Sequence, residues 1–166
     1  MLINRNNYKK NKGFSVIEII IVIAIVAVGL INLLGVAVFS LKISAIIKQT
    51  SQADSLAKES IEAIRAFRDG TDWDSNGLSV FNTGSSNPYY PELDVGPVWK
   101  LTSGAEIIGA FTRKVIFEKV SRDGSGNIET VYNAGNDDPE TRKIIATVSW
   151  SDRKVEIITY LTKCKK

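Results

Sequence analysis

A long apolar run that follows a short basic leader constrains this chain more than any other feature. Four basic side chains and no acidic one precede Gly13, and the 23 residues from Ile19 to Leu41 carry no charge. A helix that spans the hydrocarbon core of a membrane needs about 20 such residues. Glu18 is the only charged residue between Gly13 and this run. A carboxylate within a membrane segment is costly, which makes Glu18 a candidate functional residue.

The position of the leader predicts the orientation of the chain. Basic residues before a span favour a cytoplasmic amino terminus, which places the rest of the chain outside. A secretory signal peptide has a shorter apolar core and is cleaved after it, at small residues. Here the run is longer, and the natural processing point, Gly13, precedes it. We therefore expect a single-pass protein of the cytoplasmic membrane with an extracytoplasmic head.

The residues around Gly13 resemble a known signal. Gly13, Phe14 and Ser15, then Glu18 and the apolar run, are similar to the cleavage and methylation signal of type IV prepilins and pseudopilins. The resemblance implies cleavage between Gly13 and Phe14, methylation of the new amine on Phe14, and a role for Glu18 in assembly. It implies as partners a prepilin peptidase and methyltransferase, other pilin subunits, an inner-membrane assembly platform and membrane lipid. The alternative is an ordinary signal anchor whose Glu18 reaches the membrane interface.

Helical periodicity continues beyond the membrane run. Apolar residues recur at steps of three and four, which predicts an amphipathic helix that ends near Asp69 and Gly70, with Gly70 as a left-handed cap. The stripe comprises Ile43, Ile46, Ile47, Ala53, Leu56, Ala57, Ile61, Ile64 and Phe67. We expect this stripe to cover the core of the head. Residues 57–73 also resemble the helix end of minor pilins of the type IV pilus modification protein type, through Glu62, Arg65, Arg68, Asp69 and Trp73.

After a loop rich in Gly, Ser, Asn and Pro, the pattern changes to period two, which predicts strands at 98–102, 109–120, 128–132, 143–150 and 155–161. The expected fold class is α+β: a long amino-terminal helix packed on an antiparallel sheet of about four strands. The expected segments are a cleaved leader (1–13), a membrane half (14–41) and an amphipathic half (42–69) of the helix, a loop (70–97), a sheet head (98–162) and a basic tail (163–166).

Composition argues against several classes of function. The chain has no histidine, which removes His-based triads and the commonest general base, and we expect no enzyme activity. Its net charge of +3 belongs to the leader, because the residues after Gly13 contain 17 basic and 18 acidic side chains. Direct nucleic-acid binding is therefore not expected. Cys164 is the single cysteine, so it is either an unpaired thiol or an intermolecular partner.

One segment partly matches a metal-binding pattern. Asp72, Asp74, Asn76 and Gly77 match the opening of a calcium loop, but Thr83 occupies the twelfth position, where such loops carry a bidentate Glu. Asp123 to Glu129 and the acidic stretch 136–140 are weaker candidates. The simpler interpretation of all three is a polar turn, so no cofactor is expected, with calcium as the alternative.

Three functions are consistent with these features. The first is a minor pilin of a type IV pilus, a structural subunit that enters or primes a filament. The second is a pseudopilin of a type II secretion or DNA-uptake machine. The third, of another class, is a membrane-anchored binding domain that never polymerises, and an intact Gly13–Phe14 bond would favour it.

Overall fold

The computed structural model describes residue 13 and residues 15–94 and 96–164. The expected leader up to residue 12, Phe14 and the last two residues of the expected tail lie outside the described residues. The chain divides into two structural units, Met1–Ile46 and Ile47–Lys166. One helix, α1 (Val16–Gly70), contributes residues to both units.

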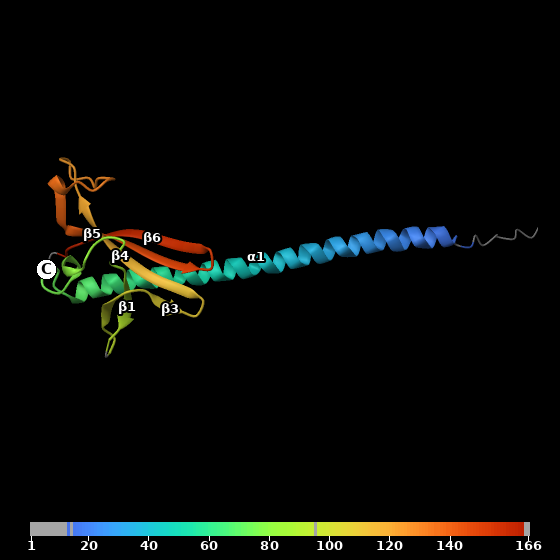
Figure 1. Cartoon of the computed structure of the whole chain (residues 1–166), viewed down its shortest axis with the longest axis horizontal. Coiled ribbons are helices and arrows are strands. Elements are labelled where there is room, and N and C mark those ends of the chain that lie inside the picture. Colours follow the sequence, from blue (N-terminus) through green and yellow to red (C-terminus); the bar gives the residue numbers. More distant parts are fainter. Residues whose placement is uncertain (1–12, 14, 95, 165–166) are drawn as a thin grey trace, which may run out of the picture. The chain divides into compact units, whose positions relative to one another are not determined.

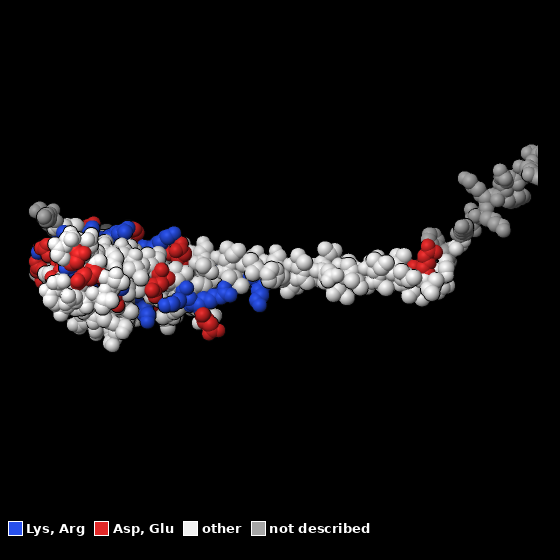
Figure 2. Space-filling model, turned by 90° about the horizontal axis from the view of Figure 1, so that it is seen from above, with Lys and Arg blue, Asp and Glu red and all other residues white. Residues whose placement is uncertain are grey.

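The α1 residues of the first unit form an apolar surface. Every described residue from Gly13 to Ala45 is exposed, and Ile23 and Leu33 keep 62% and 68% of their surface accessible. Figure 2 shows most of this stretch of helix as a long uncharged surface, with an acidic group near its amino-terminal end. By length and composition α1 can cross a membrane. No other described residue of the first unit covers these side chains, which leaves them accessible to lipid or to other helices.

Within the second unit, residues 47–70 of α1 supply one side of the core. Ala53, Ala57, Ile61 and Ile64 are buried, as the apolar stripe predicts. The stripe is wrong at its beginning, because Ile43 and Ile47 keep 39% and 62% of their surface exposed and so are not part of the core.

Ion pairs on the outer side of the same helix follow the expected spacing. Lys58 Nζ lies 2.7 Å from Asp54 Oδ2, and Arg65 Nη1 lies 2.5 Å from Glu62 Oε1. Pairs three or four residues apart stabilise an exposed helix only slightly. The charged side of α1 is therefore mainly a solvated surface.

The described part of the head contains six strands and two short 3-10 turns (Figure 1). All strand pairs are antiparallel, in the order β2-β1-β4-β5-β6, and β3 pairs with β4 beside β1. The elements are η1 (Leu78–Val80), β1 (Tyr89–Leu93), β2 (Trp99–Ser103), β3 (Glu106–Ile108), β4 (Phe111–Ser121), η2 (Ala134–Asn136), β5 (Asp137–Trp150) and β6 (Arg153–Thr162). The α+β fold class is confirmed, with a sheet of six strands where about four were expected.

One extra strand, β1, lies inside the segment 70–97 that was expected to be a loop. The sequence YYPEL does not predict a strand, because proline lacks the backbone N–H that pairing with a neighbouring strand needs. Pro91 pairs with Leu101 of β2, whereas the pairing of β1 with β4 is limited to Tyr89 and Val115. The bonds Gly104 N–H to Pro88 O and Asp94 N–H to Val98 O show that even-numbered β1 positions bond to β2. Pro91 therefore faces β4, where its missing N–H ends the ladder.

Three further expectations are wrong. Residues 128–132 form no strand, and Ile128 makes only an isolated bridge to Arg122. Strand β5 begins at Asp137, inside the acidic stretch expected to be a loop, because Asp137 and Asp138 pair with Ser121 and Val120 of β4. Gly70 is the last residue of α1 and is not among the described glycines with positive φ, so it is not a left-handed cap.

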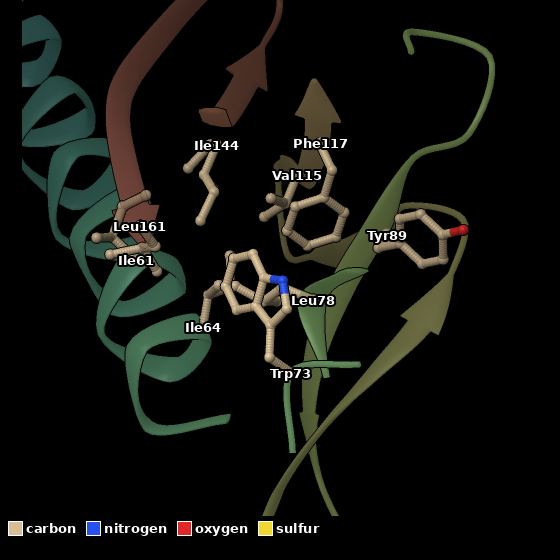
Figure 3. Packing of buried hydrophobic residues seen from close by; sticks show 10 residues of the cluster. Ile61, Ile64, Trp73, Leu78, Tyr89, Val115, Phe117, Ile144 and Leu161 are labelled. Carbon is tan, nitrogen blue, oxygen red and sulfur yellow. The ribbon is translucent and has the colours of Figure 1, made fainter. Parts of the chain in front are cut away.

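The core of the head lies between α1 and the inner face of the sheet (Figure 3). Ile61 and Ile64 face Val115, Phe117 and Ile144 across it. Nearer the β5–β6 turn, Val148 and Trp150 pack against helix positions that carry alanine. Small residues on the helix at this point leave room for the indole of Trp150. The inward-facing residues of β4 and β5 and the apolar side of α1 thus pack together in the core of the head.

Candidate processing and assembly site

The beginning of α1 positions the sequence-predicted site. Ser15 precedes the helix, and its carbonyl accepts hydrogen bonds from the N–H groups of Glu18 (3.0 Å) and Ile19 (3.3 Å). Glu18 therefore lies in the first helical turn. A carboxylate there interacts favourably with the unpaired N–H groups at the helix start.

The exposed side chain of Glu18 lies beside apolar residues of α1. Together with Ile19, Val22 and Ile23 it lines a shallow hollow of about 320 Å³. Within the part of the chain that the structure describes, no basic side chain forms an ion pair with Glu18. A carboxylate in lipid is stabilised by a nearby cation or hydrogen-bond donor.

Gly13 is exposed, and a Cβ built on it meets no described atom within 4 Å. The fold of the described chain thus gives no steric reason for glycine at this position. Phe14, the other residue of the expected cleavage site, lies outside the described residues.

The candidate calcium residues form a closed polar turn. Asp72 Oδ1 accepts hydrogen bonds from the N–H groups of Asp74 and Ser75, both at 3.1 Å, and from Ser75 Oγ at 3.0 Å. The bonds from Ser75 lower the pKa of Asp72 below its ordinary value. Asn76 Oδ1 accepts from Asp72 N–H, and Asp74 Oδ2 lies 2.5 Å from Lys163 Nζ. One carboxylate oxygen of Asp72, one of Asp74 and the amide oxygen of Asn76 are thus engaged in the turn or in an ion pair.

The other metal candidates show the same arrangement. Asp123 Oδ1 accepts from the N–H groups of Ser125 (2.9 Å) and Asn127 (2.8 Å). Asp138, in the second acidic stretch, pairs with Arg122 at 2.6 Å. Among the described residues, no group of three or more acidic, Cys or His side chains is arranged to hold a metal ion. The polar-turn interpretation fits the segments around Asp72 and Asp123, whereas Asp138 lies in strand β5.

Cys164 is exposed beside the carboxyl end of α1. Its Sγ lies 3.4 Å from Asp69 Oδ1, and Arg68 donates to the same carboxylate from Nε at 2.8 Å. The bond from Arg68 lowers the pKa of Asp69. Arg68, Asp69 and Trp73, part of the minor-pilin resemblance, thus have structural roles: Trp73 is buried, and its Nε1 donates to Pro139 O at 3.1 Å.

Sequence reasoning missed a buried ion network. Arg113 of β4 keeps only 5% of its side chain exposed and contacts Glu59 of α1 and Glu106 of β3. Its Nη1 lies 3.0 Å from Glu59 Oε1, and its Nε lies 2.8 Å from Glu106 Oε2. The alternation in β4 could have predicted that Arg113 is buried. Arg113 has the same parity as Val115 and Phe117, so its side chain lies on the same face of the strand, toward the core.

Comparisons with known proteins identify the amino-terminal segment. Residues 8–31 match the family model for the prokaryotic N-terminal methylation motif. Neither the curated proteins nor the solved structures gave a match. The matched segment contains Gly13, Phe14 and Glu18 and ends inside the apolar part of α1. Together with the long helix packed on an antiparallel sheet, it supports a type IV pilin-like or pseudopilin-like protein.

Proposed function

We propose that this chain is a minor pilin, a structural subunit rather than a catalyst. One observation carries the proposal: the methylation motif over residues 8–31 continues into a helix whose apolar surface the described part of the chain leaves uncovered. A subunit with this surface is stable in a membrane or in a bundle of like helices. The head supplies a separately packed unit that such a helix can present on a filament.

In this proposal a prepilin peptidase cleaves between Gly13 and Phe14 and the amine of Phe14 is methylated. The basic leader holds the bond at the cytoplasmic face, and the head lies outside. Inside the growing filament, Glu18 pairs with the amine at Phe14 of a neighbouring subunit. This pairing would satisfy the carboxylate for which the described chain provides no ion-pair partner.

The decisive measurement is the mass of the amino-terminal peptide from native membranes and from sheared surface filaments. The proposal expects N-methylated Phe14 as the first residue, with the processed chain enriched in the sheared fraction. Processed chain that remains in the membrane fraction would indicate a pseudopilin instead. An intact segment from Met1 to Gly13 in native membranes would make the protein a signal-anchored domain and would refute the proposal.

A further inference from the structure

Beyond an irregularity in the sheet, strands β4 and β5 continue as a two-stranded arm. The register shifts between Lys119 and Val120, so residues 139–141 of β5 have no partner on β4. A bulge of this kind bends a ribbon and changes its direction. The arm comprises residues 120–138, and Figure 1 shows it in orange, projecting beyond the rest of the sheet.

The base of the arm is held by donors from the head. Trp73 Nε1 donates to Pro139 O at 3.1 Å. Arg142, which is 7% exposed, donates to Thr141 O at 3.1 Å and to Ser79 O at 3.4 Å. A bulge leaves carbonyl groups without ladder partners, and these side chains bind two of them. The direction of the arm is therefore fixed by buried groups.

Polar bonds also order the arm internally. Arg122 Nε lies 2.6 Å from Asp138 Oδ2, and Arg122 Nη1 donates to Gly126 O at 2.9 Å. The N–H of Asn133 donates to Ser121 Oγ at 2.9 Å. A long connection between strands usually has a function of its own when it is ordered. A segment ordered in advance also loses less entropy when it binds a partner.

The ordered arm keeps apolar side chains in solvent. Val131 is 79% exposed, Tyr132 is 42% exposed and Ile128 is 36% exposed. Tyr132 Oη donates to Asp137 Oδ1 at 2.9 Å, which places this aromatic ring beside a carboxylate. Exposed apolar groups on a rigid segment, with a tyrosine among them, are typical of protein contact sites.

The arm carries negative charge that the described chain does not compensate. It contains one basic and four acidic residues, a net charge of −3, and the flanking Lys119 and Glu140 leave this sum unchanged. Arg122 pairs with Asp138, and none of the described basic side chains forms an ion pair with the other three acids. These are Asp123, Glu129 and Asp137. A second arm, a nucleic acid or an anionic lipid would be repelled, so charge complementarity requires a cationic occupant.

One of these acids also has an unsatisfied acceptor. Glu129 Oε1 accepts from Asn136 Nδ2 at 3.2 Å, whereas Oε2 is buried without a hydrogen-bond partner among the described residues. Glu129 and Ile128 line a shallow hollow of about 70 Å³. Lys143 lines the same hollow, but its Nζ lies 2.8 Å from Glu118 Oε2. An ammonium or guanidinium group from a partner would offset the cost of this oxygen.

We propose that the arm binds a cationic segment of another protein. A Lys or Arg side chain of that segment pairs with Glu129, and its apolar side chains pack on Val131 and Tyr132. The charges set the orientation and the rate of association, and the apolar contacts slow dissociation. This binding goes beyond the role of a pilus subunit and does not depend on cleavage after Gly13.

The test uses the full-length protein in micelles of an uncharged detergent and a fluorescent peptide, Lys-Lys-Leu-Ser-Leu-Ser-Leu-Lys-Lys, followed by anisotropy. Empty micelles give the background. A second peptide has Glu in place of Lys, and a third has Ser in place of Leu. The proposal expects the first peptide to bind about tenfold more tightly than either of the others at low salt. Equal binding of the Glu peptide, or no binding of the first at about 1 mM, would overturn it.

Matched charge variants locate the bound peptide. The double variant Glu129→Gln and Asp137→Asn removes two charges from the arm with little change in shape. Glu156→Gln and Asp152→Asn make the same changes in β6 and in the turn before it. The arm variant should weaken binding about fivefold, and the control variant less than about twofold. Equal weakening by both variants would show a nonspecific effect of net charge and would reject the arm as the site.

A second pair of variants tests the apolar contact. Val131→Ser should weaken binding about threefold, whereas Ile107→Ser, at a β3 residue that is 77% exposed, should leave it unchanged. Both side chains are largely in solvent, so neither change should unfold the protein, and the unfolding midpoint of every variant is measured alongside. Unchanged binding by Val131→Ser would contradict the proposed contact.

Discussion

Replacing Arg113 tests how the helix, β3 and β4 are held together. Its guanidinium donates to Glu59 and Glu106, and Nη2 also lies 3.4 Å from Pro91 O. Arg113→Met keeps most of the aliphatic stem but removes every donor. The variant leaves two carboxylates and one carbonyl without their partner.

The structure sets the size of the effect. Breaking a fully buried ion pair costs roughly 3–5 kcal/mol. Here Glu106 and Glu59 keep 31% and 49% of their side chains exposed, so water can partly replace the guanidinium. We therefore expect Arg113→Met to lower the free energy of unfolding by about 2–3 kcal/mol. By the same reasoning, Glu106→Gln should cost about 1–2 kcal/mol and Glu59→Gln less than about 1 kcal/mol.

The assay is urea unfolding of the full-length protein in detergent micelles, followed by tryptophan fluorescence. Trp73 and Trp150 are buried, so their emission reports the loss of the head core. Arg65→Met is the matched control, because its pair with Glu62 is exposed and should contribute less than about 0.5 kcal/mol. The reasoning would be refuted if Glu59→Gln cost as much as Glu106→Gln, or if Arg113→Met matched Arg65→Met.

Three other predictions concern processing, assembly and pH. Gly13→Leu should block cleavage by the cognate peptidase, whereas Gly13→Ala should reduce it only slightly; full cleavage of the Leu variant on immunoblots would contradict the prepilin interpretation. Glu18→Val should insert into membranes normally but be depleted from sheared filaments, whereas the control Asn32→Val should be retained; normal incorporation of Glu18→Val would remove the role assigned to Glu18. Hydrogen bonds from Asn127 lower the pKa of Asp123, so Asp123 stabilises the fold above its unfolded pKa of about 3.9 and loses that effect as the pH falls. The difference in unfolding temperature between the wild type and Asp123→Asn should therefore shrink between about pH 6 and pH 3, and a difference independent of pH would contradict this assignment.

Sequence reasoning succeeded where one period persists over many residues. The helical pattern ends at Asp69 and Gly70, and α1 ends at Gly70. The alternation around Phe117, in 143–150 and in 155–161 corresponds to β4, β5 and β6. In such segments each residue that faces the core repeats the same signal, so the pattern outweighs local irregularities.

Sequence reasoning failed where a strand forms because of its pairing partners and not because of its own local pattern. Strand β1 contains Pro91, and β3 has three residues; each exists because β2 or β4 provides a ladder for it. The opposite error occurred at 128–132, where a suitable pattern has no neighbouring strand and Val131 remains 79% exposed. Partners that are distant in the sequence cannot be read from a window of ten residues.

The sequence by itself determined the candidate processing site, because the proposed roles of Gly13, Phe14 and Glu18 depend on their order and spacing along one segment. It also determined the apolar half of α1, since lipid is a uniform solvent that requires only a sufficient length of uncharged helix. The tertiary structure alone decided that Arg113 joins Glu59 to Glu106 and that β6, and not β5, lies at an edge of the sheet. Those features depend on which strands become neighbours, and that choice is made by the packing of the whole sheet against the helix.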